Sequence, residues 1–251
     1  MRARVTRDEF HKMFKTAGPA VLPVIHVLDS AQIDRNIERC VRAGAQGCFL
    51  INHDFGMEAF LPLLADARRR WPDVWMGANC LAVTGADAFP HLHEMAKAGA
   101  PLDAYWADDA RIDERVAAQT EAEEIDAERS GAWRGLYFGG VAFKKQRPVD
   151  PADYQRSAEI AAGWMDVVTT SGVATGHEAD SGKIEAFRRG LGDRPMALAS
   201  GVTPDNAEAF ADVDAFLVAT GVSAPGEFHD LDPARLNALL AVTRELGTRR
   251  G

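Results

Sequence analysis

The segment MDVVTTSGVATGHEADSGKIEAFRRGLGDRPMALAS, residues 165–200, contains the unit that decides the fold. A short apolar run, MDVVTT at 165–170, is followed by a longer stretch with helical spacing and then by a second apolar run, PMALAS at 195–200. This alternation is typical of parallel strands that are joined by crossover helices. The runs are uniformly apolar, which predicts strands that are buried on both faces.

Similar apolar runs recur along the rest of the chain, and eight can be counted. The other six are AVLPVIHV (20–27), QGCFLI (46–51), DVWMGAN (73–79), LDAYWA (102–107), GLYFGGVAF (135–143) and DAFLVAT (214–220). Segments between them carry apolar residues at helical spacing, as at Ile33, Ile37 and Cys40. Eight units without a long interruption favour a closed (β/α)8 barrel of the TIM type over an open doubly wound sheet. The 251 residues fit one such domain, with residues 1–18 as an N-terminal extension or helix.

Composition limits the class of partner and the compartment. The formal net charge is -9 and no long basic run is present, which argues against nucleic acid and anionic membrane surfaces as partners. No apolar run is long enough for membrane insertion, and the charged start, MRARVTRDEFHKMFK, does not resemble an export signal. The three cysteines are scattered, as expected for core thiols in a reducing, cytoplasmic setting. A homo-oligomer is compatible with the sequence, which leaves the oligomeric state open.

Two local signals make sharper predictions. Thr203 followed by Pro204 predicts the start of a helix after the seventh strand. Pro23 lies inside the first predicted strand and lacks the N–H that a ladder requires. We therefore expect that strand to start late or to carry a bulge.

Polar residues follow nearly every predicted strand. In a (β/α)8 barrel the working site is formed where strands end and the following loops begin. These positions hold His26, Asn52, His53, Asp54, Asn79, Asp108, Asp109, Lys144, Lys145, Ser171, Thr175, Ser200 and Thr220. A ring of polar side chains that are costly to bury without partners predicts a ligand-sized cavity at the barrel mouth.

Three small-residue turns follow the last three strands: TSGVATG (170–176), ASGVTPDN (199–206) and ATGVS (219–223). Glycines let backbone N–H groups approach an anion, and barrels favour a phosphate site after strands seven and eight. The predicted phosphate-binding residues are Gly172, Gly176, Ser200, Gly201, Thr220 and Gly221. The alternative is that these are ordinary turns.

Lys144 and His26 are the candidate catalytic residues. The lysine ends an apolar strand and could stabilise developing negative charge, bind phosphate or form a Schiff base; it could also be one of two surface lysines with Lys145. The histidine could act as acid or base, or have a structural role. His53 and Asp54 lie near in sequence, but without HxH or HExxH spacing we predict no metal site.

The motifs together resemble the BtpA family. TSGVATGHEAD, ALASGVTPDNAEAF and DAFLVATGVS are similar to its glycine-rich segments, and VIHVL (24–28), NHDFG (52–56), GANCL (77–81) and VAFKK (141–145) are similar to its earlier strand ends. The resemblance implies a barrel grouped with ribulose-phosphate-binding barrels. The family is named for a role in accumulating photosystem I, and other members look like enzymes of nucleoside or sugar metabolism. The substrate-binding candidates that it implies are Asn52, Asn79, Ser171, Thr175 and Asp180; Asp180 could instead cap the next helix.

The chain also departs from the family pattern. LDSAQID (28–34) replaces a proline-rich loop, Ile51 replaces an acidic residue, YWADD (105–109) replaces a polar strand end, and Lys145 replaces a histidine. We therefore expect an enzyme that acts on a small phosphorylated sugar or nucleotide-like metabolite, with divergent substrate or chemistry. The alternative is a non-catalytic binding or assembly protein that has kept the pocket. The sequence indicates no particular cofactor.

Overall fold

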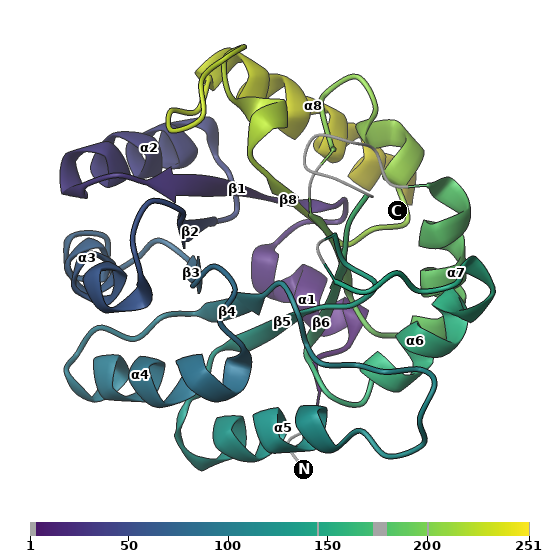
Figure 1. The fold of residues 1–251 in the computed structure, drawn as a ribbon. Helices are drawn as coiled ribbons and strands as arrows, with labels where there is room; N and C mark the ends of the chain where they lie inside the picture. The colour runs from purple at the N-terminus through teal and green to yellow at the C-terminus, as the bar shows by residue number, and fades with distance from the viewer. Residues whose placement is uncertain (1–3, 145, 173–179, 200, 251) are drawn as a thin grey trace.

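The computed structural model describes residues 4–144, 146–172, 180–199 and 201–250. In this part of the chain, eight parallel strands close into a barrel in sequence order, and helices surround it (Figure 1). The strands are β1 (Ala20–Val27), β2 (Cys48–Asn52), β3 (Met76–Asn79), β4 (Ala104–Ala107), β5 (Leu136–Gly140), β6 (Val167–Thr170), β7 (Met196–Ala199) and β8 (Ala215–Val218). The α-helices are α1 (Arg7–Phe14), α2 (Ser30–Ala43), α3 (Met57–Arg70), α4 (Gly85–Lys97), α5 (Thr120–Ala132), α6 (Tyr154–Ala161), α7 (Ser181–Leu191) and α8 (Pro233–Arg250). The predicted (β/α)8 barrel is thus confirmed.

The first strand differs from the prediction at Pro23. β1 runs over Ala20–Val27 with unbroken register to each neighbour, so the expectation of a late start or a bulge is wrong. Its first half, Ala20 to Pro23, is in register with β8, and its second half, Val24 to Val27, is in register with β2. Pro23 is thus the last residue of β1 that is in register with β8, and the register with β2 begins at the next residue.

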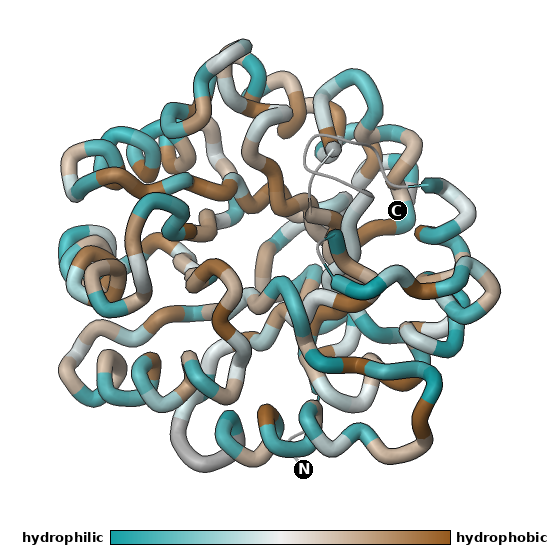
Figure 2. The backbone as a smooth tube through the Cα atoms, viewed as in Figure 1, coloured by the Kyte–Doolittle hydropathy of each residue, from teal (hydrophilic) through white to brown (hydrophobic). Residues whose placement is uncertain are grey.

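Hydrophobic residues are frequent along the barrel strands (Figure 2), and strand alternation divides them into two shells. Side chains such as Leu22 and Phe49 fill the barrel interior, whereas Ile25 and Leu50 pack outward toward the helices. The helix α1 closes the N-terminal end of the barrel, because its Phe10 and Phe14 join the interior cluster. Residues 1–18 were expected to form an extension or helix, and α1 is the helical part.

A repeated polar contact ties neighbouring strands at that same end. A side chain that precedes each even-numbered strand accepts the backbone N–H of the odd-numbered strand before it. The four contacts are Val21 to Gln46 (2.8 Å), Met76 to Asp103 (2.8 Å), Tyr137 to Asp166 (2.9 Å) and Met196 to Asp214 (2.9 Å). Each aspartate also pairs with an arginine: Arg68, Arg129 and Arg188 respectively. Polar and charged side chains therefore stabilise the N-terminal end of the barrel, whereas loops form its C-terminal rim.

Helix boundaries follow the local signals with one exception. Gly44 and Gly99 lie just past the ends of α2 and α4 with φ values of 78° and 79°, a backbone conformation that favours glycine. The helix expected to start at Thr203 is wrong. Residues 204–206 form a turn, and a short 3-10 helix, Ala207–Phe210, follows. The connection from β7 to β8 is brief, which leaves room for little more than one helical turn.

Candidate functional site at the barrel mouth

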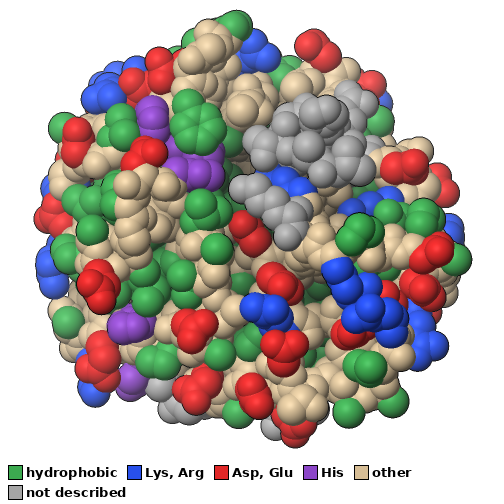
Figure 3. All heavy atoms as spheres, viewed as in Figure 1, with side chains coloured by type: hydrophobic (Ala, Val, Ile, Leu, Met, Phe, Trp, Pro, Cys, Tyr) green, Lys and Arg blue, Asp and Glu red, His purple; other side chains and the backbone are tan. Residues whose placement is uncertain are grey.

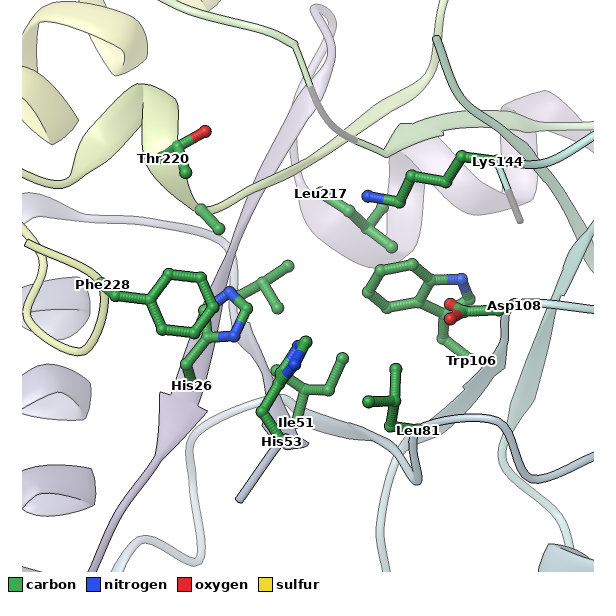
Figure 4. Close-up of a pocket in the computed structure, with 12 residues that line it drawn as sticks. His26, Ile51, His53, Leu81, Trp106, Asp108, Lys144, Leu217, Thr220 and Phe228 are labelled. Atoms are coloured by element: carbon green, nitrogen blue, oxygen red, sulfur yellow. The ribbon is translucent and has the colours of Figure 1, made fainter. Parts of the chain in front are cut away.

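A cavity of about 150 Å³ opens at the C-terminal mouth of the barrel. Its walls come from strand ends and loops around much of the ring (Figure 4). The lining residues are Val24, His26, Ile51, His53, Leu81, Trp106, Asp108, Lys144, Leu217, Ala219, Thr220 and Phe228. On this face histidines lie beside apolar side chains (Figure 3). The predicted catalytic residues, His26 and Lys144, are therefore brought to one cavity.

Strand alternation decides which strand-end residues reach this cavity. On β2, Phe49 and Ile51 point into the barrel, and His53 continues that series into the cavity wall. Asn52 has the opposite parity and is buried among the loops. Its Nδ2 donates to the Phe55 carbonyl at 2.6 Å, and its Oδ1 accepts the Leu81 N–H at 2.9 Å. The structure therefore gives Asn52 the role of holding two loops together.

His26 is nearly buried, with 8% of its surface exposed. Its ring centroid lies 4.7 Å from that of His53 and 3.9 Å from that of Phe228. Burial, with nearby His53, His229 and Lys144, lowers the pKa of His26 to about 3. The imidazole is therefore uncharged at neutral pH. Its Nδ1 has no hydrogen-bond partner among the described residues.

Phe228 belongs to the loop between β8 and α8, which is fastened to α2. Gln32 Nε2 donates to the His26 carbonyl at 3.1 Å, and Asn36 Nδ2 donates to the His229 carbonyl at 3.0 Å. The His229 ring closes the link, since its Nδ1 lies 3.0 Å from the His26 carbonyl oxygen. The residue that follows Phe228 is thus fixed to α2 and β1 by hydrogen bonds.

Lys144 and Asp108 face the histidines from the other side of the cavity (Figure 4). Asn79, which is fully buried, donates from Nδ2 to Asp108 Oδ1 at 3.0 Å and so orients this carboxylate. Trp106 lines the same side of the cavity as Lys144 and Asp108. Its Nε1 has no hydrogen-bond partner in the part of the chain described. The site therefore combines an ammonium group, a carboxylate and a neutral imidazole on largely apolar walls.

A second lysine, Lys183, supports the rim that carries Lys144. Lys183 Nζ donates to the carbonyls of Ala142 (2.6 Å) and Ser171 (2.8 Å), and burial lowers its pKa to about 8. Ser171 Oγ accepts the Lys144 N–H at 2.8 Å and donates to the Gly172 carbonyl at 2.8 Å. Ser171, a predicted substrate ligand, therefore binds backbone groups of the rim.

Asp180 caps α7, which was the alternative for this residue. Its Oδ1 accepts the backbone N–H groups of Gly182 (2.6 Å) and Lys183 (3.4 Å), and the residue is exposed. A cap of this kind satisfies N–H groups that have no partner within the helix. The structure thus explains Asp180 without a ligand.

The glycine turns are described only in part. Gly201 has φ 76°, and the Cβ of an alanine at Gly221 would lie 1.9 Å from the Val202 carbonyl oxygen. Gly221 is therefore needed for contact between the second and third turns. Gly172 is buried, and Thr220 lines the cavity. Of the predicted ligands, Thr175, Gly176 and Ser200 lie outside the described residues, as does Lys145. The phosphate role of the turns stays a prediction.

The sequence interpretation missed three residues of this region. Trp106 has the same parity as Asp108, so counting back from the strand end would have found it. Lys183 comes three residues after Asp180 and could be found once that residue is identified as a helix cap. Phe228 lies in an irregular loop, GEFHD (226–230), and no periodic signal marks it.

In residues 4–144, 146–172, 180–199 and 201–250 there is no group of three or more histidine, cysteine or acidic side chains arranged to hold a metal ion. No helix in that same part of the chain is both long and apolar enough to cross a membrane.

Comparison with known proteins identifies the fold. No protein-family model and no curated protein matches the chain. A solved structure of native KDPGal has a TM-score of 0.61 at 12% identity, covering 91% of this chain and 96% of that one. Phosphoribosyl anthranilate isomerase from Thermus thermophilus has a TM-score of 0.57 at 16% identity, covering 90% and 98%. A protein from Aquifex aeolicus VF5 has a TM-score of 0.60 at 14% identity, covering 97% and 98%. At these identities the similarity shows that the chain shares the TIM-barrel fold.

Proposed function

We propose that this protein is a BtpA-like enzyme that acts on a small phosphorylated sugar or nucleotide-like metabolite at the barrel mouth. The observation that carries the proposal is the placement of Lys144, whose amine reaches into the cavity opposite His26 (Figure 4). Cationic groups on apolar, water-poor walls stabilise developing negative charge strongly. The phosphate end of the substrate is held by cationic and hydroxyl groups of the mouth, for which Arg111 and the predicted turns beside Thr220 are the candidates. The isomerase named above supports this choice, since its name refers to a phosphoribosyl compound and its fold is the same.

The residues of the cavity divide the work as follows. Lys144 stabilises negative charge on the reacting group, and Asp108, oriented by Asn79, holds or moves a proton. His26 takes part as an uncharged imidazole that hydrogen-bonds the substrate. Asn52 and Ser171 form hydrogen bonds with the backbone of the rim loops, so they affect the substrate only by positioning those loops.

Strained backbone conformations in the rim loops support the proposal that the barrel mouth is a functional site. Among the described residues that are not glycine, four have positive φ values, and three of them lie in consecutive rim loops: Ala82 (62°), Arg111 (59°) and Ala142 (46°). Such conformations cost of order 1 to 3 kcal/mol each and gather at active sites and ligand clamps. The loops after β3, β4 and β5 therefore contain backbone conformations that lower the stability of the folded state.

A thermal-shift panel of sugar phosphates, nucleotides and inorganic phosphate tests the proposal. A ligand at one hundred times its dissociation constant stabilises the protein by about 2.7 kcal/mol. Turnover is then measured on the compounds selected by the panel. We expect Lys144→Met to lower kcat by roughly 100-fold or more with little change in KM, because the lysine acts on the transition state.

Lys97→Met is the matched control, since it removes a charge from the exposed last turn of α4. It should leave turnover and binding unchanged. Binding without turnover of any bound compound would favour the non-catalytic binding or assembly protein. The proposal fails if no phosphorylated compound stabilises the protein, or if both variants behave alike.

A further inference from the structure

The two sides of the mouth cavity have different chemistry (Figure 4). One side is a wall of three rings, His26, His53 and Phe228, whose centroids lie 3.9 to 5.5 Å apart. The other side carries Trp106 and Lys144. We call the space between them the ring chamber.

The ring wall is already in place before any ligand arrives. His26 belongs to a barrel strand, and the loop that carries Phe228 is bound to α2 through Asn36 and Asp230. Arg35 adds two bonds of 3.0 Å to the Asp230 carboxylate. A wall that is fixed in this way binds a flat ligand without a further ordering cost.

The chamber offers few hydrogen-bonding groups. Besides the rings, its lining contains the aliphatic side chains of Val24, Ile51, Leu81, Leu217 and Ala219, with Asp108, Lys144 and Thr220 as its other polar residues. A bare sugar in this space would leave several hydroxyl groups without partners, at about 1 to 3 kcal/mol for each. A planar heteroaromatic ring has apolar faces and needs only a few partners at its edge. His26 Nδ1 and Trp106 Nε1 are the buried ring nitrogens of this lining that have no partner among the described residues.

A second, more polar cavity of about 320 Å³ adjoins the ring chamber. Leu81, Asp108 and Lys144 line both cavities, so the two meet at the charged pair. The second cavity adds Asp109 and Arg111 to its lining, a set of carboxylate acceptors and cationic donors. Such a set suits the hydroxyl groups and the anionic group of a sugar phosphate.

We propose that the substrate is a nucleotide, whose base occupies the ring chamber and whose sugar phosphate extends past Lys144 and Asp108 into the polar cavity. The inference rests on the proposed function and narrows its substrate class from sugar phosphates in general to those that carry a planar heteroaromatic ring. The charged pair then lies beside the bond that joins base and sugar. His26 supplies an uncharged ring face, because its pKa lies far below neutral pH.

Calorimetric titration with defined probes tests the base and the sugar phosphate separately. The probes are AMP, GMP, CMP and UMP, with ribose 5-phosphate and inorganic phosphate for comparison. We expect at least one nucleotide to bind ten-fold or more tightly than ribose 5-phosphate. Phe228→Ala should weaken that nucleotide roughly ten-fold, the effect of losing one base-stacking partner, and should leave ribose 5-phosphate unchanged.

Two further variants keep the result interpretable. Leu28→Ala removes another exposed apolar side chain close to the end of β1, outside the lining of the chamber, and should change no affinity. Trp106→Phe keeps an aromatic ring and removes Nε1 together with part of the indole. It should weaken the nucleotide more than ribose 5-phosphate, and urea unfolding of the empty protein measures the separate cost of the lost core packing.

Equal affinity for nucleotides and ribose 5-phosphate would overturn the inference, and so would an equal loss of both in Phe228→Ala. Ribose 5-phosphate would then remain a ligand, and the proposed function would stand. If none of the phosphorylated compounds in the wider panel binds, the proposed function itself fails. The two failures are therefore distinguishable.

Discussion

Lys183 Nζ donates a 2.6 Å hydrogen bond to the carbonyl of Ala142, whose φ of 46° is one of the strained values at the mouth. The same amine bonds the Ser171 carbonyl, and Ser171 Oγ in turn binds the backbone of Lys144. A buried lysine thus compensates the strain of the rim that presents the candidate catalytic lysine. It acts on Lys144 by positioning the backbone around it.

Lys183→Met should destabilise the protein by about 1 to 3 kcal/mol, because two buried carbonyls lose their donor. The difference should depend on pH. Burial lowers the folded-state pKa of Lys183 to about 8, below the value of about 10.4 for an unfolded chain, so the unfolded state binds more protons between these limits. The stability of the wild type should therefore rise relative to the variant from pH 8 to about 10.5, by on the order of 2 kcal/mol.

Urea unfolding at several pH values measures this difference. Lys97→Met, at an exposed position, is the control and should show a constant gap over the same range. If the stability difference between the wild type and Lys183→Met did not change with pH, burial would not lower the pKa of Lys183 in the folded protein.

Asp214→Asn should cost roughly 3 kcal/mol in the free energy of unfolding, since it leaves two partly buried arginines without their counter-charge. The carboxylate is fully buried and is bound by Arg7 and His11 of α1 and by Arg188 of α7. Burial raises its pKa, but these partners outweigh burial, so the pKa lies below its ordinary value. The stabilisation is therefore present above about pH 4 and is lost as pH falls through the folded-state pKa.

Urea unfolding measures the loss in free energy of unfolding for Asp214→Asn and for the control variant Glu245→Gln. Glu245 pairs with Arg249 on the surface of α8, where an ion pair contributes little, and its loss should cost less than about 1 kcal/mol. Similar losses in the two variants at pH 7 would contradict the view that Asp214 fastens α1 to the barrel.

Gly221→Ala should destabilise the protein by about 1 to 3 kcal/mol in buffer free of phosphate. The new Cβ would lie 1.9 Å from the Val202 carbonyl oxygen, so the two turns must separate. Gly163→Ala is the control, because its Cβ would come no closer than 3.7 Å to the Ile160 carbonyl oxygen. Unchanged stability in Gly221→Ala would remove packing as the reason for this glycine and strengthen the phosphate interpretation.

The sequence predicted the barrel because the signal is repeated eight times, and an error in one unit changes little. The helix predicted to start at Thr203 after β7 was wrong, since one proline and one possible cap are a weak signal. Within the site, Lys144 and His26 line the mouth cavity, and their catalytic role stays a prediction. Asn52 was chosen because it ends a strand, although its neighbour His53 has the parity that faces the cavity. Counting parity from Phe49 would have separated the two.

Phe228 and Lys183 could not be found in this way. Their positions depend on contacts between segments far apart in sequence: Phe228 is placed by a loop bound to α2, and Lys183 by the ends of β5 and β6. Such contacts arise from tertiary packing, for which a single sequence has no periodic signature. The loop ends of the barrel are therefore less predictable than its strands.

Asn52→Ala and His53→Ala together test the parity argument, because the two residues are adjacent but face different surroundings. Asn52→Ala leaves the Leu81 N–H and the Phe55 carbonyl without partners, and it should cost about 1 to 3 kcal/mol of stability. His53 is exposed at the cavity wall, so His53→Ala should change stability by less than about 0.5 kcal/mol. It should instead weaken whichever compound the thermal-shift panel selects, since a ring of the wall is lost. Urea unfolding and calorimetric titration of both variants give the two readouts, and the reverse pattern, with Asn52→Ala losing affinity at full stability, would assign Asn52 to the ligand after all.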